Sequence, residues 1–245
     1  MKTLAAYGCS HTNTAHGTPW PDFLAEKLGM NLYRRSSPGG NVGNHLDKLN
    51  VDLQNEDIDL IVLQLSQYFR LTLGFSFHDD YFDDDYQSGF NFRDVGYYTY
   101  SGNDDDKIME SNLNYKFPKG CTGITRFIAG EIVSSKWMRQ FAQQQLYTFI
   151  ALCKSFNKKL FIFSWDEPLT GKFVPDGGAP YVWEEWEHML KGDNIGYINQ
   201  SLNGYEGWFQ EKGIEAIPND GHYGTEAHKR FVDELLYNSI SKFYI

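Results

Sequence analysis

The chain has 245 residues, with 22 Lys+Arg against 32 Asp+Glu and a formal net charge of −10. This charge has the wrong sign for a surface that neutralises nucleic-acid phosphates, so nucleic acid is not expected as a partner. A mean hydropathy of −0.50 argues against a membrane protein, and the apolar stretch near the N-terminus is too short for a secretory signal or a spanning helix. We therefore expect a cytoplasmic protein that forms one domain over residues 1–245.

The first half of the chain alternates short apolar runs, typical of strands, with helical patterns. A helix over 19–28 is favoured because Thr18 can cap it, Pro19 suits its first turn and Gly29 ends it. The clearest strand is 59–65, an almost continuous apolar run of the kind that is buried on both faces of a parallel sheet. The remaining predicted elements are strands at 2–7 and 31–35 and a helix at 43–54.

The second half continues the alternation. Apolar residues at near-helical intervals predict a long helix, a buried strand follows it, and a last helix closes the chain; these lie at 134–156, 160–163 and 225–243, with a short helix at 204–212 and a strand candidate at 214–217 between them. This order predicts a three-layer α/β/α sandwich around a mainly parallel, flavodoxin-like five-stranded sheet. In such sheets, the loops at the carboxyl ends of the strands carry the chemistry.

An insertion at about 71–131 interrupts this pattern. It lacks periodicity and is crowded with Tyr, Phe, Gly, Asn and Asp, including acidic runs at 79–85 and 104–106. Because disordered segments are usually poor in aromatic residues, we expect an ordered cap here. The acidic runs lack the ligand spacing of a calcium-binding loop, and three widely spaced cysteines suggest neither a disulfide framework nor a metal site. No metal and no cofactor are predicted.

Three motifs follow predicted strands and carry candidate chemistry. Ser10 lies in Gly8-Cys9-Ser10-His11, directly after the first strand, where a rigid strand end and a turn can present a hydroxyl beside backbone N–H groups. After the second strand, the turn 38–41 contains Gly39, Gly40 and Asn41, whose N–H and amide groups can bind an oxyanion. In the third motif, Asp220-Gly221-His222, a carboxylate two residues from an imidazole can orient the ring.

Together these motifs resemble the SGNH (GDSL-like) hydrolase family, especially its variants with a Gly-Cys-Ser-His-Thr opening, which are associated with phage and bacterial proteins. The resemblance spans nearly the whole chain through its two ends but does not include 71–131. It implies that Ser10 is the nucleophile, His222 the general base and Asp220 its orienting carboxylate. Gly40, or its neighbour Gly39, would be an oxyanion donor.

The chain departs from the family pattern in its third block. The family's Gly-x-Asn-Asp after the third strand reads Ser66-Gln67-Tyr68 here, so the Asn donor of the oxyanion hole is missing. Gln67 or Ser66 can replace it, and Arg70 can bind an anionic group. Loss of one such donor costs on the order of a hundredfold in rate.

Two further departures concern the ends of the chain. The family's aspartate before the serine is Cys9, which leaves the nucleophile intact. The family's Asp-x-x-His reads Asp-x-His, with Asn219 in the more distant position. Because an uncharged Asn does not stabilise an imidazolium, we prefer Asp220 as the partner of His222.

Two other loops lie near the predicted site. His11 and His16 share the loop of the nucleophile and can either contact substrate or make local hydrogen bonds. The segment Trp165-Asp166-Glu167 follows the fourth strand, and we expect it to be a solvated loop.

Two functions fit the sequence. The first is a serine esterase that cleaves an ester or thioester, with the aromatic and acidic cap shaping a groove for a small acyl group on a carbohydrate-like substrate. The second is a binding or structural module of the same fold, such as one carried by a virion, in which the altered third block marks a degenerate site. A separation above about 5 Å between Ser10 Oγ and the His222 ring would favour the module.

Overall fold

The computed structural model describes residues 2–36, 42–54, 57–66, 70–72, 97–99, 135–165, 168–171, 181–198, 204–218 and 222–244. Its centre is a five-stranded sheet with the order β2-β1-β3-β6-β9. All four neighbouring pairs are parallel. The strands are β1 (Thr3–Gly8), β2 (Asn31–Ser36), β3 (Ile58–Leu65), β6 (Lys159–Ser164) and β9 (Ile195–Tyr197). Counted along the chain, this is the predicted flavodoxin-like order 2-1-3-4-5.

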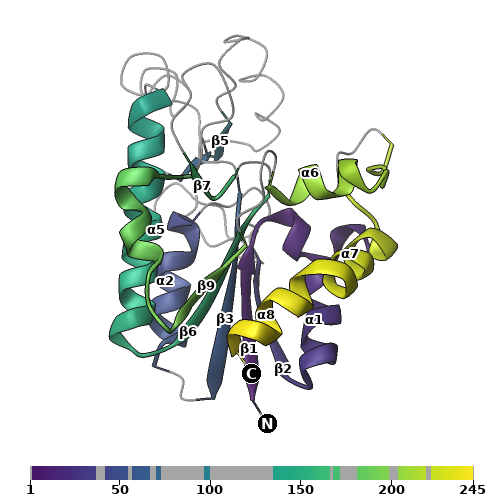
Figure 1. Ribbon diagram of the computed structural model, residues 1–245, viewed down its shortest axis with the longest axis horizontal. Coiled ribbons are helices and arrows are strands. Elements are labelled where there is room, and N and C mark those ends of the chain that lie inside the picture. Colours follow the sequence, from purple (N-terminus) through teal and green to yellow (C-terminus); the bar gives the residue numbers. More distant parts are fainter. Residues whose placement is uncertain are drawn as a thin grey trace, which may run out of the picture.

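Helices cover both faces of the sheet, which confirms the predicted α/β class (Figure 1). One face carries α2 (Gly43–Asp52) and α5 (Ser135–Ser155). The other carries α1 (Trp20–Leu28) and a C-terminal helical run made of α7 (Thr225–Phe231), a π-helical turn (Val232–Leu236) and α8 (Tyr237–Tyr244). The short helix α6 (Gly204–Glu211) packs beside this run. Among the described residues, no helix is both long and apolar enough to cross a bilayer.

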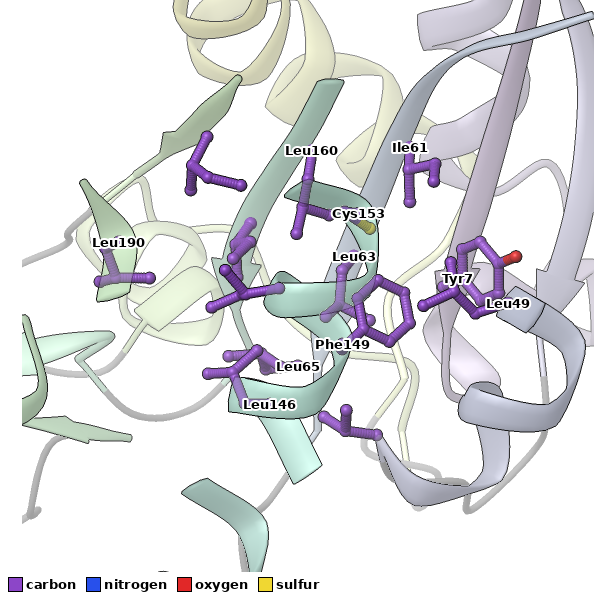
Figure 2. Close-up of a cluster of buried hydrophobic side chains, with 14 of the residues drawn as sticks. Tyr7, Leu49, Ile61, Leu63, Leu65, Leu146, Phe149, Cys153, Leu160 and Leu190 are labelled. Atoms are coloured by element: carbon purple, nitrogen blue, oxygen red, sulfur yellow. The ribbon is translucent and has the colours of Figure 1, made fainter. Parts of the chain in front are cut away.

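Each face of the sheet has its own apolar core. Figure 2 shows the core beneath α2 and α5, where Tyr7 of β1 meets Phe149 edge-on, with ring centres 5.4 Å apart. The core on the other face contains Trp20, Phe163 and Phe231. Complete burial of one such side chain contributes about 1.5–3 kcal/mol, so the two cores fix the strands that position the site.

The predicted and the observed elements differ in three places. Helix α1 is preceded by Pro19 rather than capped by Thr18; the Thr18 N–H instead donates to Thr225 Oγ1 at 3.0 Å. The strand predicted at 214–217 is wrong, because this segment is irregular. Its place in the sheet is taken by β9, which pairs with β6.

The edge strand β9 escaped prediction because it has three residues and a glycine at its centre. A Cβ on Gly196 would lie 2.7 Å from a ring carbon of Phe161 and 2.6 Å from one of Phe243. Glycine is therefore required by the close approach of α8 to the sheet, although the same residue weakens a strand signal in the sequence.

Two small strand pairs lie outside the main sheet. β4 (Arg70–Thr72) pairs antiparallel with β5 (Tyr97–Thr99), and β7 (Thr170–Gly171) pairs parallel with β8 (Val182–Trp183). A 3₁₀ helix, Glu184–Leu190, follows β8. Of the predicted insertion at 71–131, only 71–72 and 97–99 belong to the described residues.

Candidate active site

The predicted nucleophile lies on a tight turn at the carboxyl end of β1. Strand β1 ends at Gly8, and Ser10 opens a 3₁₀ turn, Ser10–Thr12. The Thr12 N–H donates to the Cys9 carbonyl at 3.1 Å, and the Asn13 N–H donates to the Ser10 carbonyl at 3.0 Å. Cys9 is buried, so the turn is anchored in the protein immediately before the serine.

His222 meets this serine from the other end of the sequence. Its Nε2 lies 2.7 Å from Ser10 Oγ, although 212 positions separate the two residues. The backbone helps to place His222, because its carbonyl accepts the N–H of Ile217 at 2.7 Å. With the ring proton on Nδ1, the serine hydroxyl donates to Nε2, which is the contact between a nucleophile and its base.

The prediction that His222 follows the last strand is wrong. It follows α6 and an irregular segment, and it precedes α7. The segment that contains Ile217 has no regular secondary structure. Its backbone hydrogen bond to His222 nevertheless helps to place the imidazole within reach of Ser10.

Aromatic rings surround the His222 imidazole. The ring of His16 stacks on it, with centres 4.0 Å apart and planes inclined by 17°. The His11 ring lies 4.5 Å from it at 35°, and His11 in turn stacks on Trp165 at 3.3 Å and 17°. The two loop histidines therefore pack against the candidate base.

Trp165 corrects one expectation from the sequence. Its side chain is 6% exposed, so the prediction of a solvated loop is wrong at this position. Besides His11, it packs against Tyr205 and Tyr223 at ring separations of 4.4 and 5.8 Å. Asp166 and Glu167 lie outside the described residues.

Of the remaining predicted site residues, the structure describes two. His11 is placed and is 7% exposed. Arg70 belongs to β4, where its backbone pairs with Thr99. The others lie outside the described residues; they are Gly39, Gly40, Asn41, Gln67 and Asp220.

Two buried histidines near the site are held neutral. Burial lowers the pKa of His228 to about 4, and its Nδ1 lies 2.7 Å from the Tyr205 hydroxyl. Burial lowers the pKa of His45 to about 3. Within the described residues, no group of three or more His, Cys, Asp or Glu side chains is arranged to hold a metal ion.

Sequence reasoning gave too little weight to two kinds of residue here. Trp165 and His16 come from separate loops, and no spacing in the sequence predicts that they stack on His11 and His222, respectively. Gln64 interrupts the apolar run of β3 and is the signal that could have been noticed, because a buried amide requires partners.

No protein-family model matches this sequence, and no curated protein matches it. Among solved structures, the chain is similar to the psychrotrophic esterase EstA from Pseudoalteromonas sp., inhibited by monoethylphosphonate, with 10% identity and a TM-score of 0.50 over 99% of this chain and 98% of that one. It is also similar to a catalytic mutant of Axe2, an acetylxylan esterase from Geobacillus stearothermophilus, with 10% identity and a TM-score of 0.50 over 99% and 94% of the two chains. At this identity, the likeness shows a shared fold.

Proposed function

Because this chain has the SGNH-type hydrolase fold, we propose that it is a serine esterase that cleaves an ester or thioester through an acyl-enzyme on Ser10. The observation that carries the proposal is the 2.7 Å contact between Ser10 Oγ and His222 Nε2. This distance lies within hydrogen-bond reach, whereas a degenerate binding module has no need to keep the two groups together.

In the first half of the reaction, Ser10 Oγ attacks the carbonyl carbon of the ester while His222 Nε2 takes the hydroxyl proton. The tetrahedral intermediate collapses as its bond to the alcohol oxygen breaks, and the imidazolium gives its proton to that oxygen. The alcohol leaves, and the acyl group stays on Ser10.

In the second half, a water molecule takes the place of the alcohol. His222 removes a proton from the water as it attacks the acyl carbonyl, and the proton then passes to Ser10 Oγ as the acid is released. The free hydroxyl and the neutral imidazole are restored, so atoms and protons balance over the cycle.

The supporting roles in this proposal rest on sequence order. Asp220 holds the Nδ1 proton of His222 and stabilises the imidazolium, while the backbone of Gly40 or Gly39 and the amide of Asn41 bind the oxyanion. Gln67 replaces the missing Asn donor, and Arg70 and His11 contribute to the substrate pocket.

For the substrate, we propose a small acyl group on a carbohydrate-like polar alcohol. The acidic and aromatic side chains of 71–131 can hydrogen-bond to and stack on sugars. One structure of similar fold is an acetylxylan esterase, which supports acetylated xylo-oligosaccharides as the first substrates to assay.

The test is labelling by a fluorophosphonate together with hydrolysis of p-nitrophenyl acetate. We expect wild type to be labelled and to turn over the ester, and Ser10→Ala to lose both by about 10⁴-fold or more. Ser155→Ala is the matched control, because this serine is exposed on α5 and its hydroxyl donates to the Ala151 carbonyl of the same helix. Labelling that persists in Ser10→Ala, or wild type that neither reacts nor hydrolyses, would overturn the proposal in favour of a binding module.

A further inference from the structure

A single amide interrupts the buried central strand of the sheet. Strand β3 is apolar along most of its length, yet Gln64 lies within it and is 2% exposed. Burying an amide without partners costs about 2–7 kcal/mol, so the partners of this side chain indicate why the position is polar.

Both ends of the Gln64 amide bind the turn that carries Ser10. The Thr12 hydroxyl donates to Gln64 Oε1 at 2.5 Å, and Gln64 Nε2 donates to Cys9 Sγ at 3.3 Å. One partner precedes the serine by one residue and the other follows it by two. The amide therefore binds the turn on both sides of the serine in sequence.

The network extends to α1. Thr12 is completely buried, and its hydroxyl also accepts the indole N–H of Trp20 at 3.3 Å. Its hydroxyl thus donates to β3 and accepts from α1. Polar groups that are satisfied in this way hold one geometry, because any movement leaves a buried donor or acceptor without a partner.

Gly8 lets the turn come this close to β3. A Cβ on Gly8 would lie 2.0 Å from Thr12 Oγ1 and 2.9 Å from Gln64 Oε1, so no other residue fits unless the network moves. The turn therefore fits against the strand in one position. The length of the Gln64 side chain sets the distance between the turn and β3.

We propose that Gln64 is a positioning residue that holds the Cys9–Thr12 turn so that Ser10 Oγ reaches His222 Nε2. This inference rests on the proposed esterase function. A displacement of about 1 Å in a reacting group can cost about a hundredfold in rate, which is the size of effect that loss of this contact should produce.

The experiment compares Gln64→Met with Gln143→Met. Both glutamines are buried, at 2% and 4% exposure, and methionine has a similar length without the amide. Gln143 lies on α5 in a small pocket that Leu146, Ile150 and Val182 also line. We expect Gln64→Met to lower kcat and the fluorophosphonate labelling rate by about a hundredfold while KM stays within about twofold. Gln143→Met should leave all three within about twofold.

A second pair keeps the test decisive if Gln64→Met folds poorly. Thr12→Ser keeps the hydroxyl and should retain activity, whereas Thr12→Val keeps the shape, removes the donor and should lower kcat. Equal kcat in Thr12→Ser and Thr12→Val, or losses that follow the unfolded fraction in all variants, would overturn the positioning role.

A separate measurement distinguishes this inference from the proposed function. The ¹⁵N chemical shift of His222 Nε2 reports its hydrogen bond with Ser10 whether or not the protein turns over a substrate. An inactive wild type would refute the esterase, while a shift that changes in Gln64→Met and not in Gln143→Met would still support positioning. An identical shift in Gln64→Met and wild type would refute positioning.

Discussion

The imidazole of His16 stacks on that of His222, with ring centres 4.0 Å apart and planes inclined by 17°. A ring held against a flat neighbour keeps its plane, and the plane decides whether Nε2 points at Ser10 Oγ, which lies 2.7 Å away. The contact with His16 therefore helps to keep His222 Nε2 directed at Ser10 Oγ, in addition to its contribution to packing.

Replacing His16 separates the shape of its ring from its chemistry. We expect His16→Phe to keep kcat within about threefold and His16→Leu to lower it about tenfold, because stacking of flat rings contributes about 0.5–1.5 kcal/mol. Steady-state kinetics on p-nitrophenyl acetate provide the measurement. His188→Leu is the control, since His188 is exposed on the 3₁₀ helix. Equal loss in His16→Phe and His16→Leu would show that the imidazole itself, rather than a flat ring, is required.

The carboxylate that partners His222 can be identified by paired substitutions. We expect Asp220→Asn to lower kcat by about 10⁴-fold, because the neutral amide no longer favours the Nδ1-protonated ring or the imidazolium. Asn219→Ala should change kcat by less than about tenfold. The reverse order of effects would assign the orienting role to Asn219.

The unfolding free energy should decrease as the pH falls, because His228 stays neutral inside the folded protein. The unfolded chain binds a proton near pH 6.5, whereas burial lowers the pKa of His228 in the folded state to about 4. The unfolded state therefore holds more protons in this window, and stability is lost as pH falls from about 6.5 towards 4. His45, with a pKa lowered to about 3, adds a contribution of the same sign.

Urea unfolding of wild type and His228→Gln at two pH values measures this effect. We expect the decrease in unfolding free energy between about pH 7 and pH 5 to be smaller in the variant by about 2 kcal/mol. An unchanged decrease would mean that His228 takes up its proton without unfolding.

The ion pair between Asp52 of α2 and Arg35 of β2 should contribute to stability and not to catalysis. Asp52 is 2% exposed and accepts two hydrogen bonds from Arg35, at 2.8 Å from Nε and 2.5 Å from Nη2, and another from the Tyr7 hydroxyl. Burial, together with Asp52, raises the pKa of Tyr7 well above its ordinary value, so its hydroxyl stays a donor.

We expect Asp52→Ala to lower the unfolding free energy by about 3 kcal/mol, because it leaves the Tyr7 hydroxyl and a partly buried guanidinium without their acceptor. Asp22→Ala, which breaks the more exposed pair with Arg34, should cost less than about 1 kcal/mol. Urea titrations give both values, and kcat per folded molecule should be unchanged in each. A drop in kcat of folded Asp52→Ala would connect this pair to the site.

The strands with long apolar runs could be predicted from the sequence, because a strand that is buried on both faces leaves few polar residues. Strand β3 is the clearest case, whereas β9 has three residues and a central glycine and gives no such run. The apolar residues at 214–217 suggested a strand, but Ile214 and Ala216 pack against the core on the α1 face without joining the sheet.

The place of Ser10 follows from a rule of parallel sheets, since a residue directly after a strand lies at the carboxyl edge of the sheet. The place of His222 does not, because it follows α6 and an irregular segment rather than a strand. The rings around His222 follow from no such rule. Trp165, His11 and His16 come from two loops, and their stacking depends on side-chain directions that appear only when the chain is folded. The contacts of Gln64 could not be predicted for the same reason, although the sequence shows a polar residue within the apolar run of β3.

The 212 positions between Ser10 and His222 also have a consequence for synthesis. A ribosome adds the serine 212 positions before the histidine, so the nascent chain carries a nucleophile without its base over that whole stretch of translation. On the proposed chemistry, the polypeptide cannot hydrolyse anything until synthesis has passed residue 222 and both loops have met at the sheet. Products that end before residue 222 would lack the base and would be inactive on this chemistry.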